Sequence, residues 1–392
     1  MNRFAAILIA SLIARLSYQM ARSPVLPRFA ESFGATPELI GLIVAASTIT
    51  GVVFKLPAGA LSDLLGRRRL MLLGAVFFAV PPFCYPLVEG AGALFVLRFV
   101  HGFATAIFSP VASAYVASLG ERGRGARLGW FSSASDIGAT SGPLLGGLVL
   151  YATASFADTY LLSGVLGAVA LLCVLLVPDV EPEVFSPVEP RKGRAGEFWA
   201  GLREVGKTPM VFLAAGAEAT MYVGFGAFLG FLPLYAATVG LNDAQIAVVL
   251  ALELSVSVLA KPLAGRISDR VGRRPVIVIG LLLCSAALPY IFRAASFAGL
   301  LAAVPMLGLG VAAVTPATNA YLADLVATRR LGAAMGVFGT IWDVGEAAGP
   351  ILAGVLIGSF GYRPAFDITA AATAALALAF AVLSRRPLVR SG

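Results

Sequence analysis

Ten ionisable side chains lie inside long apolar stretches of this sequence, where charged residues are rare. The acidic members are Asp136, Glu218, Glu253, Asp343 and Glu346, and the basic members are Arg15, Arg22, Lys55, Arg98 and Lys261. An unpaired charge in an apolar interior is expensive, so the equal numbers suggest that these groups pair or line a wet cavity. A buried carboxyl group is also a candidate for binding and releasing protons, because burial penalises its charged form.

The stretches that carry these residues are long enough to cross a lipid bilayer. Of the 392 residues, 59% are hydrophobic and only 13% are charged, which is too little polar surface to cover a soluble protein. Apolar runs of about 20 residues match a hydrocarbon layer of roughly 30 Å. The sequence therefore predicts an all-α membrane protein with twelve spans, near residues 5–29, 38–62, 70–88, 92–117, 128–151, 159–177, 209–237, 244–266, 275–293, 297–323, 332–358 and 364–384.

The basic residues indicate how the chain is oriented. Of the 29 Lys and Arg, 21 fall in the termini and in alternate loops, and the loops on the other side hold only Arg28, Arg293 and Arg363. The positive-inside rule places both termini in the cytoplasm. The net charge of +8 is thus a sign of topology, and we expect no nucleic-acid partner.

The sequence predicts no cofactor and no metal. Cys84, Cys173 and Cys284 lie in apolar spans and are expected to act as small buried hydrophobic residues, and the single histidine, His101, excludes a multi-histidine cluster. No Walker A sequence is present, so ATP hydrolysis is not expected to supply energy. A membrane enzyme would need a compact catalytic constellation, which the sequence does not contain.

The chain is an internal duplication of six spans. Residues 59–68 (GALSDLLGRR) return 206 residues later as residues 265–274 (GRISDRVGRR), and Lys55 returns as Lys261. The glycines and the Gly-Pro pair of residues 129–147 return 207 residues later, and Asp136 returns as Asp343. We therefore expect an N-terminal bundle at residues 1–178, a cytoplasmic linker at 179–207 and a C-terminal bundle at 208–392.

These motifs resemble those of the major facilitator superfamily, over the whole chain. The loop signature G-x-L-x-D-x-x-G-R-R stands in both halves, with Leu64 where a basic residue is common in the first copy. Residues 98–102 (RFVHG) resemble the fourth-helix motif R-x-x-Q-G, with His101 in place of Gln. Residues 129–147 match the fifth-helix pattern of proton-driven exporters, so the drug:proton antiporters are the nearest group. Close helix packing alone would also explain these glycines.

The resemblance implies two pseudo-symmetric six-helix bundles that carry a small molecule by alternating access. Spans one, four, seven and ten then line the cavity, and the candidate substrate residues are Arg15, Tyr18, Gln19, Arg22, Arg98, His101, Tyr222 and Asn319. Each could instead be a packed polar group. Glu218, on a cavity span, is the first candidate for proton coupling, with Asp136, Asp343, Glu253 and Glu346 as alternatives and Arg98 tuning a nearby carboxylate. His101 either titrates or makes a structural hydrogen bond.

Two sets of charges are candidate gates. The loop motifs supply Asp63, Arg67, Arg68, Asp269, Arg273 and Arg274, which either latch the cytoplasmic side or only enforce topology. Lys55 lies about 12 Å into the membrane from Asp63, and Asp136 lies about 13 Å in from Arg127. In the resembled fold spans two and eleven, and spans five and eight, face each other. We therefore expect Lys55 to pair with Asp343 and Asp136 with Lys261, unless each lysine snorkels or pairs within its own half.

The leading hypothesis is a proton-coupled exporter of small amphipathic compounds. Three arginines in spans one and four favour a neutral, zwitterionic or anionic substrate over a lipophilic cation. An uptake symporter for a metabolite or a lipid carrier of the same fold remains open, and so does a non-transporting receptor. The composition and the resemblance suggest a bacterial inner membrane and a monomer, with substrate, protons and lipid as the partners.

Overall fold

The computed structural model describes residues 3–120, 123–177, 209–326 and 331–384, and every regular element in these ranges is a helix. The prediction of an all-α protein is confirmed. Eleven candidate spans in the described chain are long and apolar enough to cross a membrane. The predicted linker at 179–207 lies outside the described residues.

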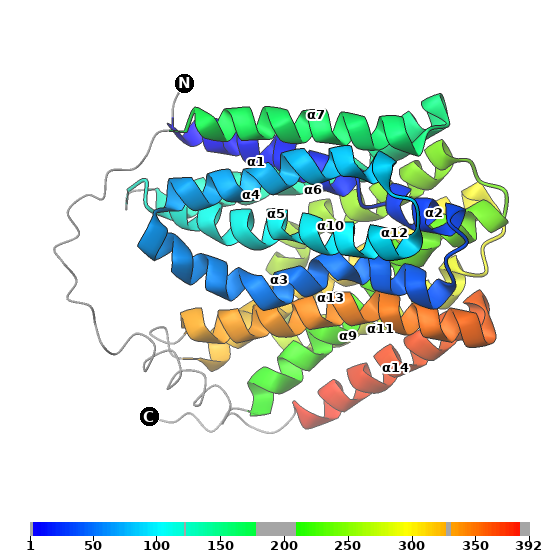
Figure 1. The fold of residues 1–392 in the computed structure, drawn as a ribbon. Helices are drawn as coiled ribbons and strands as arrows, with labels where there is room; N and C mark the ends of the chain where they lie inside the picture. Colours follow the sequence, from blue (N-terminus) through cyan, green and yellow to red (C-terminus); the bar gives the residue numbers. More distant parts are fainter. Residues whose placement is uncertain (1–2, 121–122, 178–208, 327–330, 385–392) are drawn as a thin grey trace. The chain divides into compact units, whose positions relative to one another are not determined.

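The helices extend beyond the predicted spans by a few residues at most ends (Figure 1). In the N-terminal repeat they are α1 Arg3–Met20, α2 Val25–Ser32, α3 Pro37–Leu65, α4 Arg67–Cys84, the 3-10 turn η1 Tyr85–Leu87, α5 Ala91–Ala117, α6 Arg124–Thr153 and α7 Phe156–Leu175. In the C-terminal repeat they are α9 Pro209–Thr238, α10 Asp243–Val271, α11 Arg273–Ile291, α12 Phe297–Leu325, α13 Leu331–Phe360 and α14 Tyr362–Leu383.

The first predicted span is not one continuous helix. It is divided into α1 and α2, which are separated by a turn that contains Pro24. Proline has no amide hydrogen for the helical ladder and disfavours helical geometry in the residue before it. The corresponding span of the second repeat, α9, stays helical over 30 residues. The two repeats therefore differ in their first spans.

The fifth span, α6, is helical over 30 residues but is not among the eleven helices that qualify as candidate spans by hydropathy and charge. It carries Arg127 and Asp136 and has small residues at close intervals, including Gly138, Gly142 and Pro143. Hydropathy alone therefore misses it, although its length is ample for a bilayer. The glycine-rich side of α6 packs against α1. Small residues are needed there because they let the two backbones approach closely, and such residues contribute little hydropathy.

The chain forms two compact units that do not coincide with the two repeats. Among the described residues, unit 1 holds everything up to 177 together with 229–251 and 350–358, and unit 2 holds 209–228, 252–349 and 359–384. In unit 1, α1 packs against α6 and α7, and α5 packs against α3 and α4. In unit 2, α11 packs against α12 and α14. The division into two six-helix bundles stays a prediction.

The duplication is visible in glycine contacts that recur in both units. A Cβ added to Gly142 of α6 would lie 2.8 Å from the carbonyl oxygen of Leu16 in α1. A Cβ added to Gly349 of α13, 207 residues later, would meet the backbone of Val223 and Ala227 in α9. The same correspondence relates Gly102 against Ser47 and Thr50 to Gly308 against Glu253 and Val256. Backbones thus approach closely at equivalent places, which holds the helices together where lipid supplies no hydrophobic driving force.

Within unit 1, the second part of α9 and the start of α10 pack on the N-terminal repeat. The Arg28 guanidinium donates to the Asp243 carboxylate across 2.8 Å, and both side chains are about one quarter exposed, at 24% and 22%. The Ser23 hydroxyl donates to the Leu229 carbonyl across 3.2 Å. A Cβ on Gly147 would lie 2.8 Å from the Asp243 carbonyl oxygen. One ion pair and close backbone packing therefore join segments of both repeats inside this unit.

We predict that Gly142→Ala lowers the melting temperature of the purified protein, because the added methyl group forces α1 and α6 apart. Gly129→Ala is the matched control in the same helix, since a Cβ there meets nothing within 4 Å. Alanine is a better helix former than glycine by about 1 kcal/mol, so the control is expected to be neutral or stabilising. Thermal unfolding in detergent checks both, and equal effects of the two variants would contradict the packing assigned to Gly142.

We predict a coupling energy of about 1 kcal/mol between Arg28 and Asp243, the upper range for a partly exposed pair. Thermal unfolding of Arg28→Gln, Asp243→Asn and the double variant measures it. The reversed pair, Arg28→Asp with Asp243→Arg, is expected to recover part of the stability. Glu31→Gln removes the longer and more exposed ion pair of Arg28, at 3.7 Å, and is expected to have a smaller effect. Additive effects of the two single variants would show that the pair contributes nothing.

Candidate functional site

The ten charged residues of the spans are segregated between the two units. Unit 1 holds four basic residues and one acid, namely Arg15, Arg22, Lys55, Arg98 and Asp136. Unit 2 holds four acids and one base, namely Glu218, Glu253, Asp343, Glu346 and Lys261. These ten residues therefore balance over the whole chain, but within the spans unit 1 holds mostly bases and unit 2 mostly acids.

Glu218 is a buried carboxyl group on α9 in unit 2. It is only 2% exposed, and the Thr318 hydroxyl of α12 donates a 2.8 Å hydrogen bond to its Oε2. Lys261 of α10 is near enough to interact with it electrostatically. Thr318 lies one residue before the predicted Asn319, whose amide instead donates to the Thr315 carbonyl within its own helix across 2.7 Å. The hydrogen-bond partner of Glu218 is thus Thr318, which the sequence analysis did not predict.

Glu253 is more deeply enclosed. It is fully buried on α10, and neither carboxyl oxygen has a hydrogen-bond partner among the described residues. Gly308 of α12 packs against its backbone, and Lys261 interacts with it electrostatically as well. Lys261 therefore lies within the field of two carboxyl groups of its own unit. A proton on Glu253 would remove a charge that no described donor stabilises.

Tyr222 connects Glu218 to the acids of α13. Its ring centroid lies 4.8 Å from that of Trp342, with the rings tilted by 32°. It interacts electrostatically with Glu218, Asp343 and Glu346. The structure thus brings three predicted acids of unit 2 together around Tyr222, which was itself predicted. Trp342 was not predicted, although it stands directly before Asp343 in the sequence.

Arg98 and His101 of α5 form the corresponding centre of unit 1. Both are fully buried. The Arg98 guanidinium carbon lies 4.8 Å from the ring centroid of Tyr18 on α1, and that ring meets the His101 ring edge-on at 4.9 Å. Tyr85 of η1 and Tyr160 of α7 stack at 4.2 Å and complete the surroundings. These two tyrosines were missed because they lie on spans that the resemblance does not assign to the cavity.

The other predicted residues of unit 1 lie along α1 and the turn after it. Gln19 has a buried amide oxygen without a partner among the described residues, and its Cβ packs beside Gly142. The Arg15 Cβ packs beside Gly138. Arg22 lies near enough to Tyr18 to interact electrostatically. The Cβ atoms of Arg15 and Gln19 thus lie at the contact with α6, and the role of these residues in substrate binding stays a prediction.

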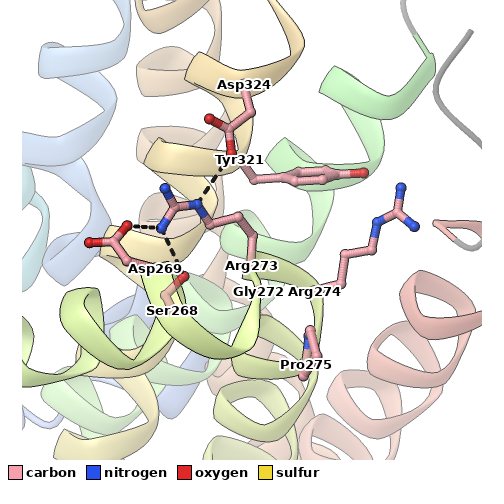
Figure 2. A pocket seen from close by; sticks show the side chains of 8 residues that line it. All are labelled: Ser268, Asp269, Gly272, Arg273, Arg274, Pro275, Tyr321 and Asp324. Carbon is pink, nitrogen blue, oxygen red and sulfur yellow. Dashed lines mark hydrogen bonds and ion pairs between the residues drawn. The ribbon is translucent and has the colours of Figure 1, made fainter.

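The second copy of the loop motif forms a charge cluster around a cavity of about 420 Å³ (Figure 2). Arg273 donates to the Asp269 carboxylate, and its Nε donates to Asp324 across 3.2 Å. Arg274 points away from this pair, with its guanidinium carbon 5.8 Å from the Tyr321 ring centroid. Asp324 was not predicted, because it has no acidic counterpart in the first repeat.

The first copy of the motif makes different contacts. Arg67 donates to the Ala114 carbonyl near the end of α5 across 3.2 Å, and Arg68 donates to the Val177 and Leu175 carbonyls at the end of α7. Cationic side chains are favourable at such carbonyl ends. The Asp63 side chain lies outside the described part of the protein. Lys55 and Asp136 belong to unit 1 and Asp343 and Lys261 to unit 2, so their cross-pairing stays a prediction.

Relatives of known sequence cover nearly the whole chain. An uncharacterized MFS-type transporter of Methanocaldococcus jannaschii is 25% identical over 358 residues, which are 89% of each chain. The multidrug resistance protein MdtG of Enterobacter lignolyticus is 27% identical over 364 residues, covering 88% of this chain and 84% of the relative. MdtG of Citrobacter koseri is 26% identical over 366 residues.

Solved structures share the fold at lower identity. A bacterial homologue of the human lysosomal transporter Spinster matches with a TM-score of 0.81 at 16% identity, covering 97% of this chain and 95% of that chain. The nucleoside transporter NupG matches with a TM-score of 0.82 at 14% identity, covering 97% and 100%. The sequence profile of the Major Facilitator Superfamily matches residues 7–252 and 214–392. The chain therefore belongs to the Major Facilitator Superfamily, and it is a multi-span membrane transporter of small molecules rather than an enzyme.

Proposed function

We propose that this protein exports small amphipathic organic compounds in exchange for protons. The observation that carries the proposal is Glu218, a carboxyl group that is almost fully buried and has a neutral hydroxyl as its hydrogen-bond donor. Protonation removes its charge, and deprotonation restores it in an apolar setting. A group of this kind is suited to link proton binding to a change in the state of the carrier.

Two further observations support export. Relatives that cover most of this chain are named multidrug resistance proteins, at 26 to 27% identity. Residues 129–147 match the fifth-helix pattern of proton-driven exporters, and Gly138 and Gly142 of this pattern pack directly on α1. The proposal includes a monomer in a bacterial inner membrane. It also places both termini in the cytoplasm, because the basic residues gather in the loops on that side.

In the proposed cycle, Glu218 holds a proton in one state and gives it up in another. The neutral acid can remain in the closed interior while the carrier changes its access side. When a substrate enters, the field around Tyr222, Asp343 and Glu346 changes, and the proton leaves. Lys261 and Thr318 stabilise the carboxylate once it is free. Proton release and substrate binding thereby become alternatives, which is the requirement for exchange.

Proteoliposomes that enclose a pH-sensitive dye test this proposal. With an acidic lumen, addition of a substrate outside is expected to raise the lumenal pH, since the compound enters as protons leave. A symporter would instead lower the lumenal pH, so the sign of the signal distinguishes export by antiport from uptake by symport. Protein-free liposomes correct for compounds that cross the bilayer as free bases.

We predict that Glu218→Gln abolishes the substrate-dependent proton signal but retains substrate exchange across the membrane without a gradient. Glutamine resembles the protonated acid in shape and cannot release a proton. Glu89→Gln is the matched control, because Glu89 is exposed in the loop after η1. Proton flux that survives in Glu218→Gln would exclude Glu218 as the coupling group, and no signal from any compound with wild-type protein would contradict the proposed function.

A further inference from the structure

The Arg98 cluster consists of Arg98, His101, Tyr18, Tyr85 and Tyr160, which come from four helical elements of unit 1. All five side chains are buried, and four of them are fully buried. Nε and Nη2 of Arg98 have no hydrogen-bond partner among the described residues. The described residues also offer Arg98 no ion-pair partner. A permanent positive charge is therefore enclosed here, and two of its donor nitrogens have no acceptor among the described residues.

The histidine adds to this excess of donors. His101 Nδ1 lies 3.5 Å from Arg98 Nη1 and 3.1 Å from the Tyr85 hydroxyl. Because a guanidinium can only donate, we assign Nδ1 as the acceptor and place the hydrogen on Nε2. His101 Nε2 and the Tyr160 hydroxyl are also buried without partners in the described structure. Two nitrogen atoms of Arg98, one of His101 and one hydroxyl are thus left to donate.

A water molecule would satisfy some of these donors but would leave the charge uncompensated. An oxyanion satisfies both needs, since a carboxylate accepts two parallel bonds from a guanidinium and balances its charge. The surroundings suit the rest of an amphipathic molecule. Tyr85 and Tyr160 present stacked rings, and Tyr18 packs edge-on against Phe78 at 5.8 Å.

We propose that the Arg98 cluster binds the carboxylate of an amphipathic substrate, with Arg98 as the main anchor. His101 holds one edge of the guanidinium in place through Nδ1, and the Tyr160 hydroxyl donates to the bound anion. The cluster is closed to water in this structure, so the tyrosine rings must rotate before a ligand enters. This inference rests on the proposed function and names a substrate class for it. Binding measured without a proton gradient tests the inference separately from proton coupling.

The first experiment measures binding to the purified full-length protein in detergent. The probes are aromatic and alkyl monocarboxylates, each with its matched primary amide and primary amine. Isothermal titration calorimetry gives the affinity, and the rise in melting temperature with ligand gives an independent reading. We expect wild-type protein to bind carboxylates in preference to their amides and amines. Preference for the amines, or no binding of any carboxylate, would overturn the proposal.

Arg98→Gln is expected to weaken carboxylate binding by about tenfold or more, the loss that removal of a charged hydrogen bond causes. Arg98→Lys keeps the charge without the planar fork, so its affinity should fall between wild type and Arg98→Gln. Arg293→Gln is the matched control, because Arg293 is half exposed and pairs with Asp367 in unit 2. Equal carboxylate affinity in wild type and Arg98→Gln would refute Arg98 as the anchor.

Tyr160→Phe tests the donor excess without changing charge. In the ligand-free protein its melting temperature should be unchanged or higher, because the lost hydroxyl has no partner. Its carboxylate affinity should fall by a few-fold. A clear loss of ligand-free stability would show that the hydroxyl is already bonded and would contradict the assignment.

The liposome assay distinguishes the failure of this inference from the failure of the proposed function. Proton-coupled flux of amines or neutral compounds, with no carboxylate binding, would leave the proposed function standing and overturn the inference. Carboxylate binding that depends on Arg98, without proton flux from any compound, would support the inference and contradict proton coupling.

Discussion

The free-energy cost of a charge or an unbonded peptide group in hydrocarbon governs this protein. Helices satisfy their own peptide groups, which explains why every regular element of the described chain is helical. The same cost makes each charged residue of the spans informative. Glu218 has a hydroxyl donor, Arg98 has stacked tyrosines and a histidine nearby, and Glu253 has carboxyl oxygens that no described donor reaches. An ionisable group held at this cost is a candidate site for binding a proton or a ligand.

Close helix packing provides the scaffold on which these groups are held. In hydrocarbon, apolar side chains gain little by leaving lipid, so backbone contact at glycine takes a larger share of the stabilisation. Gly142 makes a close backbone contact with α1 in unit 1, and Gly349 makes the equivalent contact with α9 in unit 2. Tyr18 lies two residues after Leu16 in α1, and Tyr222 directly precedes Val223 in α9. The packing contacts of the duplicated scaffold therefore lie directly beside the polar residues of each unit.

The chemistry departs from the duplication that built the scaffold. Glu253 stands where the first repeat has Ser47, and Arg98 corresponds to Val304. Glu253 and Ser47 lie at equivalent helix contacts, and Arg98 and Val304 lie on equivalent spans. Only one member of each pair carries a charge. Among the ten charged residues of the spans, acids therefore predominate in unit 2 and bases in unit 1. The proposed proton site and the proposed anion site therefore belong to different units.

The sequence alone determined the all-helical class, eleven of the spans by hydrophobicity, the duplication and the family motifs, because each is written in local composition or in spacing along the chain. It also identified Glu218, Arg98 and His101, since ionisable residues stand out in apolar runs. Only the tertiary structure decided their neighbours. Thr318, Trp342, Tyr85 and Tyr160 are unremarkable in sequence, and their importance follows from contacts between helices distant along the chain. The pairing of Arg28 with Asp243 likewise depends on how the helices pack, which no local pattern encodes.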